Sequence, residues 1–99
     1  MNVHAAPDAG GALSAVATIR NQRGLHARAA AKFVQVSGRF DATIAVTKGG
    51  QTVSGNSIMG LMMLAAGTGC EIEVAASGNE AAAALKALTA LIDAKFDEE

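Results

Sequence analysis

The sequence predicts a two-layer α+β domain in which helices cover one face of an antiparallel sheet. The order of its segments is strand, helix, strand, strand, helix, strand, helix, without internal repeats. The strand segments alternate apolar and polar residues, which is typical of a sheet with one buried and one solvated face. A length of 99 residues corresponds to a single domain, so the helices must pack together on the buried face.

The first strand and the first helix are separated by a short loop. Residues 13–20 alternate, with the apolar side chains at the odd positions, and this pattern predicts a half-buried strand. Residues 21–24 read as a loop. Residues 27–37 are rich in alanine and place apolar side chains at helical spacing, and Gly38 supplies a stop signal.

A hairpin and a short helix follow. Residues 42–47 and 51–54 flank a Lys-Gly-Gly turn, which indicates two antiparallel strands. Asn56 or Ser57 can cap a short helix that runs through Leu64.

The last strand precedes the clearest helix. Residues 70–74 alternate, and the segment from Ser77 to Glu80 has the spacing of a capping box. Apolar residues then recur at helical spacing at Leu85, Leu88, Ile92 and Phe96.

Residues 1–12 show no periodicity and contain Pro7 and a Gly-Gly pair. We therefore expect a flexible N-terminal arm over residues 1–12 and a folded domain over residues 13–99. His4 lies in this arm, and we expect no role for it.

Composition excludes several classes of protein. The hydrophobic fraction of 51% and the charged fraction of 17% argue against a disordered chain. No segment offers the roughly 20 predominantly apolar residues that a membrane span requires. The predicted strands carry no aromatic side chain for base stacking, which argues against nucleic acid as a partner. The single cysteine, Cys70, cannot form an intramolecular disulfide, so we expect a cytoplasmic protein.

The net charge of −1 hides an uneven distribution. A charge run is most often a solvated face, and we keep this interpretation for the acidic stretch from Glu71 to Glu99. The basic residues between positions 20 and 39 surround the candidate site described next, and we expect them to hold phosphate and to meet an acidic partner. They are Arg20, Arg23, Arg28, Lys32 and Arg39.

Most catalytic or metal sites lack the residues they need. Two histidines and one cysteine, at positions 4, 26 and 70, do not supply a zinc or iron site. The sequence contains neither a nucleophile elbow nor a phosphate-binding glycine loop. We therefore expect no metal and no cofactor.

His26 is the strongest candidate for chemistry. It follows a glycine loop and directly precedes the helix over residues 27–37, where free N–H groups and the helix dipole favour an anion. A phosphoryl group on the imidazole could accept hydrogen bonds from the N–H groups of Ala27 and Arg28, and the Arg28 guanidinium could add a charged contact. The alternative is a surface histidine that only caps the helix.

The short helix carries a second candidate surface. Ile58, Met59 and Met62 can be partly exposed, and methionine-rich surfaces adapt to several partners, although a methionine stripe is more often core. Ser57, at the start of this helix, is a position where a phosphate would be tolerated.

With both segments in view, the chain from about residue 13 to residue 96 resembles the HPr family. Its members are the histidine-phosphorylatable carriers of the phosphoenolpyruvate-dependent phosphotransferase system. The motifs that carry the resemblance are Gly24-Leu25-His26-Ala27-Arg28, Ala30-Ala31-Lys32-Phe33-Val34 and Ser57-Ile58-Met59-Gly60-Leu61-Met62.

The resemblance implies a fold and a set of roles. The fold is an open-faced β-sandwich, with a four-stranded antiparallel sheet of order 1-4-2-3 and three helices on one face. His26 would accept a phosphoryl group at Nδ1 from Enzyme I and donate it to an enzyme IIA domain, with Arg28 at the phosphate. Ser57 would be phosphorylated by HPr kinase/phosphorylase. The residues that would dock partners are Ile58, Met59 and Met62.

The resemblance also implies a carrier rather than a turnover enzyme, and we expect a monomer. Two features depart from the family: Ala29 stands where proline is usual, and the arm over residues 1–12 is longer than the family needs. Two alternatives stay open. One is a mainly regulatory paralogue that acts in nitrogen or carbon signalling as a phosphorylation-switched binding module. The other is an α+β domain that binds a small ligand without covalent chemistry and is indifferent to His26.

Overall fold

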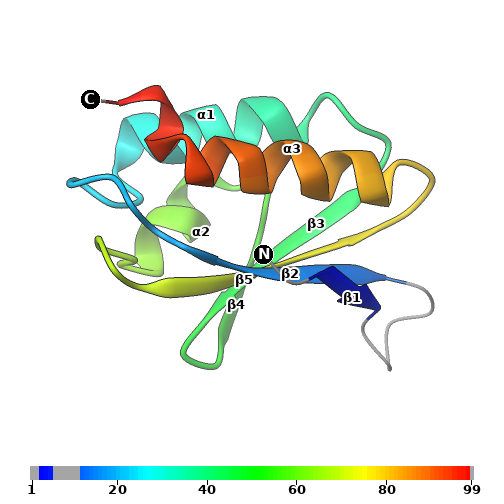
Figure 1. Ribbon diagram of the computed structural model, residues 1–99, viewed down its shortest axis with the longest axis horizontal. Coiled ribbons are helices and arrows are strands. Elements are labelled where there is room, and N and C mark those ends of the chain that lie inside the picture. Colours follow the sequence, from blue (N-terminus) through cyan, green and yellow to red (C-terminus); the bar gives the residue numbers. More distant parts are fainter. Residues whose placement is uncertain (1–2, 6–11, 99) are drawn as a thin grey trace.

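The computed structural model describes residues 3–5 and 12–98, and its helices lie over one face of an antiparallel sheet (Figure 1). The strands are β1 (Val3–Ala5), β2 (Leu13–Thr18), β3 (Thr43–Lys48), β4 (Gln51–Ser54) and β5 (Glu71–Ser77). The helices are α1 (Ala27–Ser37), α2 (Ile58–Met63) and α3 (Ala81–Asp93), and a 3-10 turn, η1 (Lys95–Asp97), follows α3.

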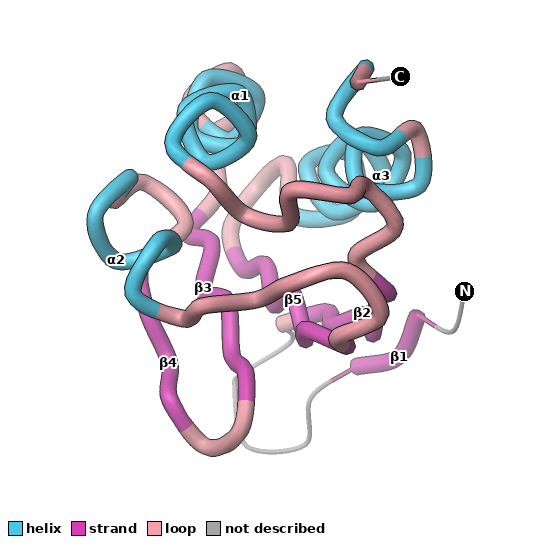
Figure 2. The backbone as a smooth tube through the Cα atoms, turned by 90° about the vertical axis from the view of Figure 1, so that its left-hand side faces the viewer, coloured by secondary structure: helices cyan, strands magenta, loops and turns pink. Residues whose placement is uncertain are grey.

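The sheet has the strand order β1-β2-β5-β3-β4, and all pairings are antiparallel. The four strands from β2 to β4 have the predicted order 1-4-2-3, which confirms the predicted sheet. Figure 2 shows α1 and α3 nearly end-on above the sheet, with α2 beside β4. The opposite face carries the exposed side chains of Val16, Glu71 and Glu73, so the sandwich is open on this side.

A strand in the N-terminal segment was not predicted. Val3–Ala5 forms β1 and pairs antiparallel with β2, with His4 opposite Ser14. Without β1, β2 would be an edge strand with unpaired backbone N–H and C=O groups. The three residues of β1 supply partners along this edge. The structure therefore has a strand at residues 3–5, where we expected a flexible arm. A segment of three residues is too short to show the alternation that would have predicted it. The other expectations for the arm concern residues outside those described, apart from Ala12, which is buried.

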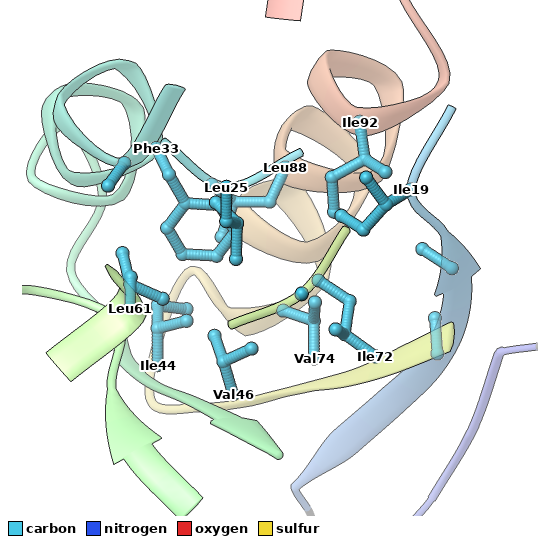
Figure 3. Close-up of a cluster of buried hydrophobic side chains, with 14 of the residues drawn as sticks. Ile19, Leu25, Phe33, Ile44, Val46, Leu61, Ile72, Val74, Leu88 and Ile92 are labelled. Carbon is cyan, nitrogen blue, oxygen red and sulfur yellow. The ribbon is translucent and has the colours of Figure 1, made fainter. Parts of the chain in front are cut away.

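The core lies between the sheet and the helices. The β5 side chains alternate as predicted, with Ile72, Val74 and Ala76 buried and their neighbours facing solvent or half-buried. Figure 3 shows side chains of the sheet directed toward those of the helices. The sheet contributes Ile44, Val46, Ile72 and Val74, and the helices contribute Phe33, Leu61, Leu88 and Ile92.

Both ends of α3 differ from the sequence prediction. Glu80, not Ser77, occupies the N-cap, and its Oε1 accepts a hydrogen bond from the Asp41 N–H at 2.7 Å instead of closing a capping box. The helix ends at Asp93, so Phe96 does not belong to it. Phe96 is nevertheless fully buried, because the chain turns back through η1 with a positive φ at Phe96 of 53°.

Candidate functional site

His26 lies at the N-cap of α1, as predicted, with an extended backbone (φ −73°, ψ 177°). Its carbonyl accepts the Ala30 N–H at 2.8 Å, which begins the helical hydrogen-bond pattern. The N–H groups of residues 27–29 precede that bond and share the positive end of the helix dipole. The His26 side chain makes no capping hydrogen bond to the helix, so the alternative of a histidine that only caps the helix is wrong.

The loop before His26 is fixed by the loop between α2 and β5. The Leu25 N–H donates to the Ala66 carbonyl at 2.9 Å, and the Leu25 side chain is buried in the core. Gly24 has a φ of +65°, and a Cβ at this position would lie 2.4 Å from the Ala66 oxygen. Only glycine permits this approach, and the approach sets where His26 stands.

A hollow of about 390 Å³ opens beside His26. Arg23, Arg28 and Lys32 line it, so three of the five basic residues from the predicted segment gather at the histidine. Cationic groups of this kind, next to a helix N-terminus, suit a bound phosphoryl group.

The expectation that all five basic residues surround His26 is wrong for two of them. Arg20 lies near Asp93, with Nε and Oδ1 4.0 Å apart and both side chains exposed. Arg39 lies just beyond the other end of α1 and lines a separate groove between α1 and α3. Eleven helical residues separate the two ends of α1, and sequence proximity does not show this separation.

Glu98 is a site residue that the sequence reasoning missed. Its Oε2 contacts the Nε2 of His26, and its Oε1 accepts a hydrogen bond from Asn21 Nδ2 at 3.1 Å. The side chains of His26 and Glu98 are only 15% and 19% exposed. The expectation that the whole acidic stretch is solvated is therefore wrong at Glu98.

The contact with His26 changes the acidity of Glu98. The hydrogen bond from His26 lowers the pKa of the Glu98 carboxyl below its ordinary value, and desolvation opposes the shift. The Asn21 amide and the charges of His26 and Arg23 lower this pKa further.

Two contacts bring the end of the chain to His26. The Phe96 side chain is buried in the core, and the Phe96 carbonyl accepts a hydrogen bond from Lys32 Nζ at 2.7 Å. The Glu98 N–H donates to the Lys95 carbonyl at 3.0 Å, which completes the turn. The core spacing of Phe96 is visible in the sequence, but no pattern indicates that the tail returns to α1.

Ser57 caps α2, and its Oγ accepts the Gly60 N–H at 2.9 Å. Leu61 of this helix is buried, but its other four large apolar side chains are exposed, so the alternative of a core methionine stripe does not describe them. The exposed fractions are 40% for Ile58, 71% for Met59, 40% for Met62 and 67% for Met63, which the sequence reasoning did not single out.

Met62 is the member of this helix that the structure brings to the histidine. A second hollow of about 320 Å³ is lined by both His26 and Met62, together with Arg23 and the loop around Ala66. The exposed face of α2 therefore continues into the surroundings of His26.

Within residues 3–5 and 12–98, no three histidine, cysteine, aspartate or glutamate side chains are grouped so that they could hold a metal ion. The helices of the same residues are too short or too polar to cross a membrane.

Comparison with known proteins adds independent information. The family described as "PTS HPr component phosphorylation site" matches residues 13–94. The chain is 50% identical over 80 residues to phosphocarrier protein HPr of Neisseria meningitidis, covering 81% of this chain and 90% of that protein. It is 48% identical over 81 residues to phosphocarrier protein NPr of Shewanella violacea, covering 82% of this chain and 89% of that protein.

Solved structures agree with these matches. The crystal structure of HPr-C-His from Thermoanaerobacter tengcongensis has a TM-score of 0.83 and 42% identity, covering 87% of this chain and 97% of that chain. The crystal structure of HPr from Bacillus anthracis has a TM-score of 0.81 and 42% identity, covering 84% of this chain and 99% of that chain.

Substitution of Gly24 tests the contact that positions His26. Gly49 is the matched control, because its φ of +56° is similar but a Cβ there would meet nothing within 4 Å. We expect Gly49→Ala to cost about 1 kcal/mol from backbone strain alone and Gly24→Ala to cost about 3 kcal/mol, because the Ala66 carbonyl must also move. Urea unfolding measures both, and equal losses would show that the collision is absent.

The lowered pKa of Glu98 predicts a dependence of stability on pH. A carboxylate whose folded pKa lies below the ordinary 4.5 stabilises the fold above that pH, and the contribution is lost as the pH falls through the folded pKa. The excess free energy of unfolding of the wild type over Glu98→Gln should therefore shrink from neutral pH to about pH 3. Asp97→Asn controls for loss of a neighbouring charge, and a constant excess over this range would contradict the contact.

Proposed function

The protein belongs to the HPr family of phosphocarrier proteins, and we propose that it carries a phosphoryl group on His26 within the phosphoenolpyruvate-dependent phosphotransferase system. The group comes from Enzyme I and passes to an enzyme IIA domain. His26 is an acceptor that is charged and discharged in turn, so the protein is a carrier intermediate rather than a turnover enzyme.

One observation carries this proposal: a histidine at a helix N-terminus opens onto a hollow lined by three cationic side chains. Nε2 is engaged by Glu98, and Nδ1 has no hydrogen-bond partner among the described residues, which supports Nδ1 as the acceptor. The N–H groups of Ala27 and Arg28 and the Arg28 guanidinium hold the phosphoryl oxygens.

The docking surface is the exposed face of α2, with Ile58, Met59 and Met62. Met62 shares a hollow with His26, so a partner that covers this face also reaches the imidazole. Flexible methionine side chains suit a surface that must receive both a donor and an acceptor of the phosphoryl group.

Ser57 is the regulatory site, phosphorylated from ATP by HPr kinase/phosphorylase. It begins the docking helix, so a phosphate there adds negative charge beside the surface that partners use. The similarity to a relative named NPr favours a second candidate, in which the protein acts mainly as a phosphorylation-switched binding module in nitrogen or carbon regulation.

Labelling tests the carrier function. Incubation with Enzyme I and labelled phosphoenolpyruvate should give an acid-labile, base-stable label that His26→Ala abolishes, because the phosphoramidate bond is lost with the imidazole. His4→Ala, at the only other histidine, is the control and should keep the label. A label that survives in His26→Ala would place the phosphoryl group elsewhere.

A second labelling experiment tests the regulatory site. Ser57→Ala should eliminate ATP-dependent labelling by HPr kinase/phosphorylase, whereas Ser54→Ala, at an exposed serine in β4, should not. Loss of the cap should cost about 1 kcal/mol of stability, so unfolding is measured in parallel. Undiminished labelling of a folded Ser57→Ala protein would exclude Ser57.

A further inference from the structure

A groove of about 400 Å³ runs between α1 and α3, the two helices that lie side by side above the sheet (Figure 2). It opens to solvent, because exposed side chains from both helices line it, among them Arg39 and Ala90. The hollows beside His26 are lined by no residue of α3. The α1–α3 groove is therefore a surface that the carrier function leaves unexplained.

The floor of the groove is apolar. Val36 of α1 and Leu91 of α3 line it, and both are half-buried against the core. The α3 wall is built from Ala87, Ala90 and Ala94, which follow one another at helical spacing. Side chains this small leave room for an approaching backbone, and covering the apolar floor removes its surface from water.

The cationic side chains of the groove lie on its α1 side. Lys32 and Arg39 are seven residues apart, which corresponds to about two helical turns or roughly 10 Å. Gln35 lies between them, and the α3 wall carries no charged residue. Among the described residues, the lining has one acidic side chain, Asp97 of η1, next to Phe96, whose carbonyl binds Lys32 Nζ. Two cations thus face one carboxylate.

Arg39 is free to meet a partner. Its side chain is exposed and makes no ion pair within residues 3–5 and 12–98. Its backbone N–H donates to the Val36 carbonyl at 3.1 Å, which holds the residue against the end of α1. An unpaired cation beside an apolar floor favours a ligand that is apolar on one face and acidic at its edge.

We propose that the α1–α3 groove binds an amphipathic helix of a partner protein, with acidic residues two turns apart on that helix. Its apolar face covers Val36 and Leu91, and its backbone packs along the alanines of α3. Two of its carboxylates face Lys32 and Arg39, because a helix aligned with α1 has the same rise per turn.

The groove reaches the site at one end only. Lys32 and Asp97 line both the groove and the hollow beside His26. No residue of α2 lines the groove, so a helix that fills it leaves the exposed face of α2 uncovered. The inference therefore goes beyond the proposed carrier function, and it adds an interaction surface separate from the α2 docking face.

A synthetic helical peptide tests the proposal. The probe has about three turns held by a staple, leucines along one face and two glutamates seven positions apart beside them. In NMR titrations of nitrogen-labelled protein, it should shift the amide signals of residues 32–39 and 87–94 and leave those of α2 unchanged. A matched peptide with glutamines in place of the glutamates should bind about tenfold more weakly, because two exposed ion pairs are lost.

Two pairs of variants test the walls of the groove. Arg39→Glu should weaken the glutamate peptide about tenfold, whereas Lys86→Glu, the same change of charge at an exposed residue of α3 outside the groove, should have little effect. Ala90→Leu fills the groove from an exposed position and should also weaken binding about tenfold. Ala82→Leu, exposed on α3 but outside the groove, is its control.

Four results overturn the proposal. They are the absence of binding by the glutamate peptide, signal shifts at α2 in place of α3, equal binding of the two peptides, and unchanged binding in Arg39→Glu or Ala90→Leu. Light scattering of the protein alone adds a further check. A dimer that Ala90→Leu dissociates would show that a second copy of this chain occupies the groove, which also contradicts the proposal.

Discussion

The hydrogen bond from the Leu25 N–H to the Ala66 carbonyl is the interaction on which the site depends. It joins the loop before α1 to the loop after α2, two segments distant in the sequence, and the glycine at position 24 makes their approach possible. It holds the residue before His26 against the loop that leads out of α2, and so it sets where His26 lies relative to α2. The same loop supplies the Gly24 carbonyl, which accepts a hydrogen bond from Asn21 Nδ2. Asn21 Nδ2 also donates to Glu98, so this loop is linked to the C-terminal tail as well.

Much of the fold could be predicted because it depends on local periodicity. The half-buried alternation of β2 and β5 and the bounds of α1 follow from patterns of two and of 3.6 residues. The capping box failed because tertiary contacts claim its residues: Ser77 pairs with Thr43 at the end of β5, and Glu80 binds the Asp41 N–H. The edge strand β1 is too short for any pattern, and it forms because β2 offers a free edge.

In the candidate site, too, the features that depend on neighbouring residues could be predicted, and those that depend on tertiary contacts could not. The position of His26 and Arg28 at the start of α1 could be predicted, because the glycine loop and the helix start are adjacent in the sequence. Glu98 could not, because a buried Phe96 and a turn return the tail to α1 across the whole domain. Asn21 could not be predicted either, because the sequence does not show that its amide donates to both the Gly24 carbonyl and Glu98 Oε1. The net charge of −1 therefore conceals an arrangement in which cationic side chains line the hollow beside His26 and one carboxylate faces the imidazole.

The central claim is that Nδ1 of His26 accepts the phosphoryl group while Nε2 keeps its proton. Phosphorus and nitrogen NMR of the protein labelled in its histidines, after phosphorylation by Enzyme I and phosphoenolpyruvate, tests this claim most directly. The account predicts coupling between phosphorus and Nδ1 of His26, with a proton on Nε2. Coupling to Nε2, or phosphorus attached to any other residue, would contradict it.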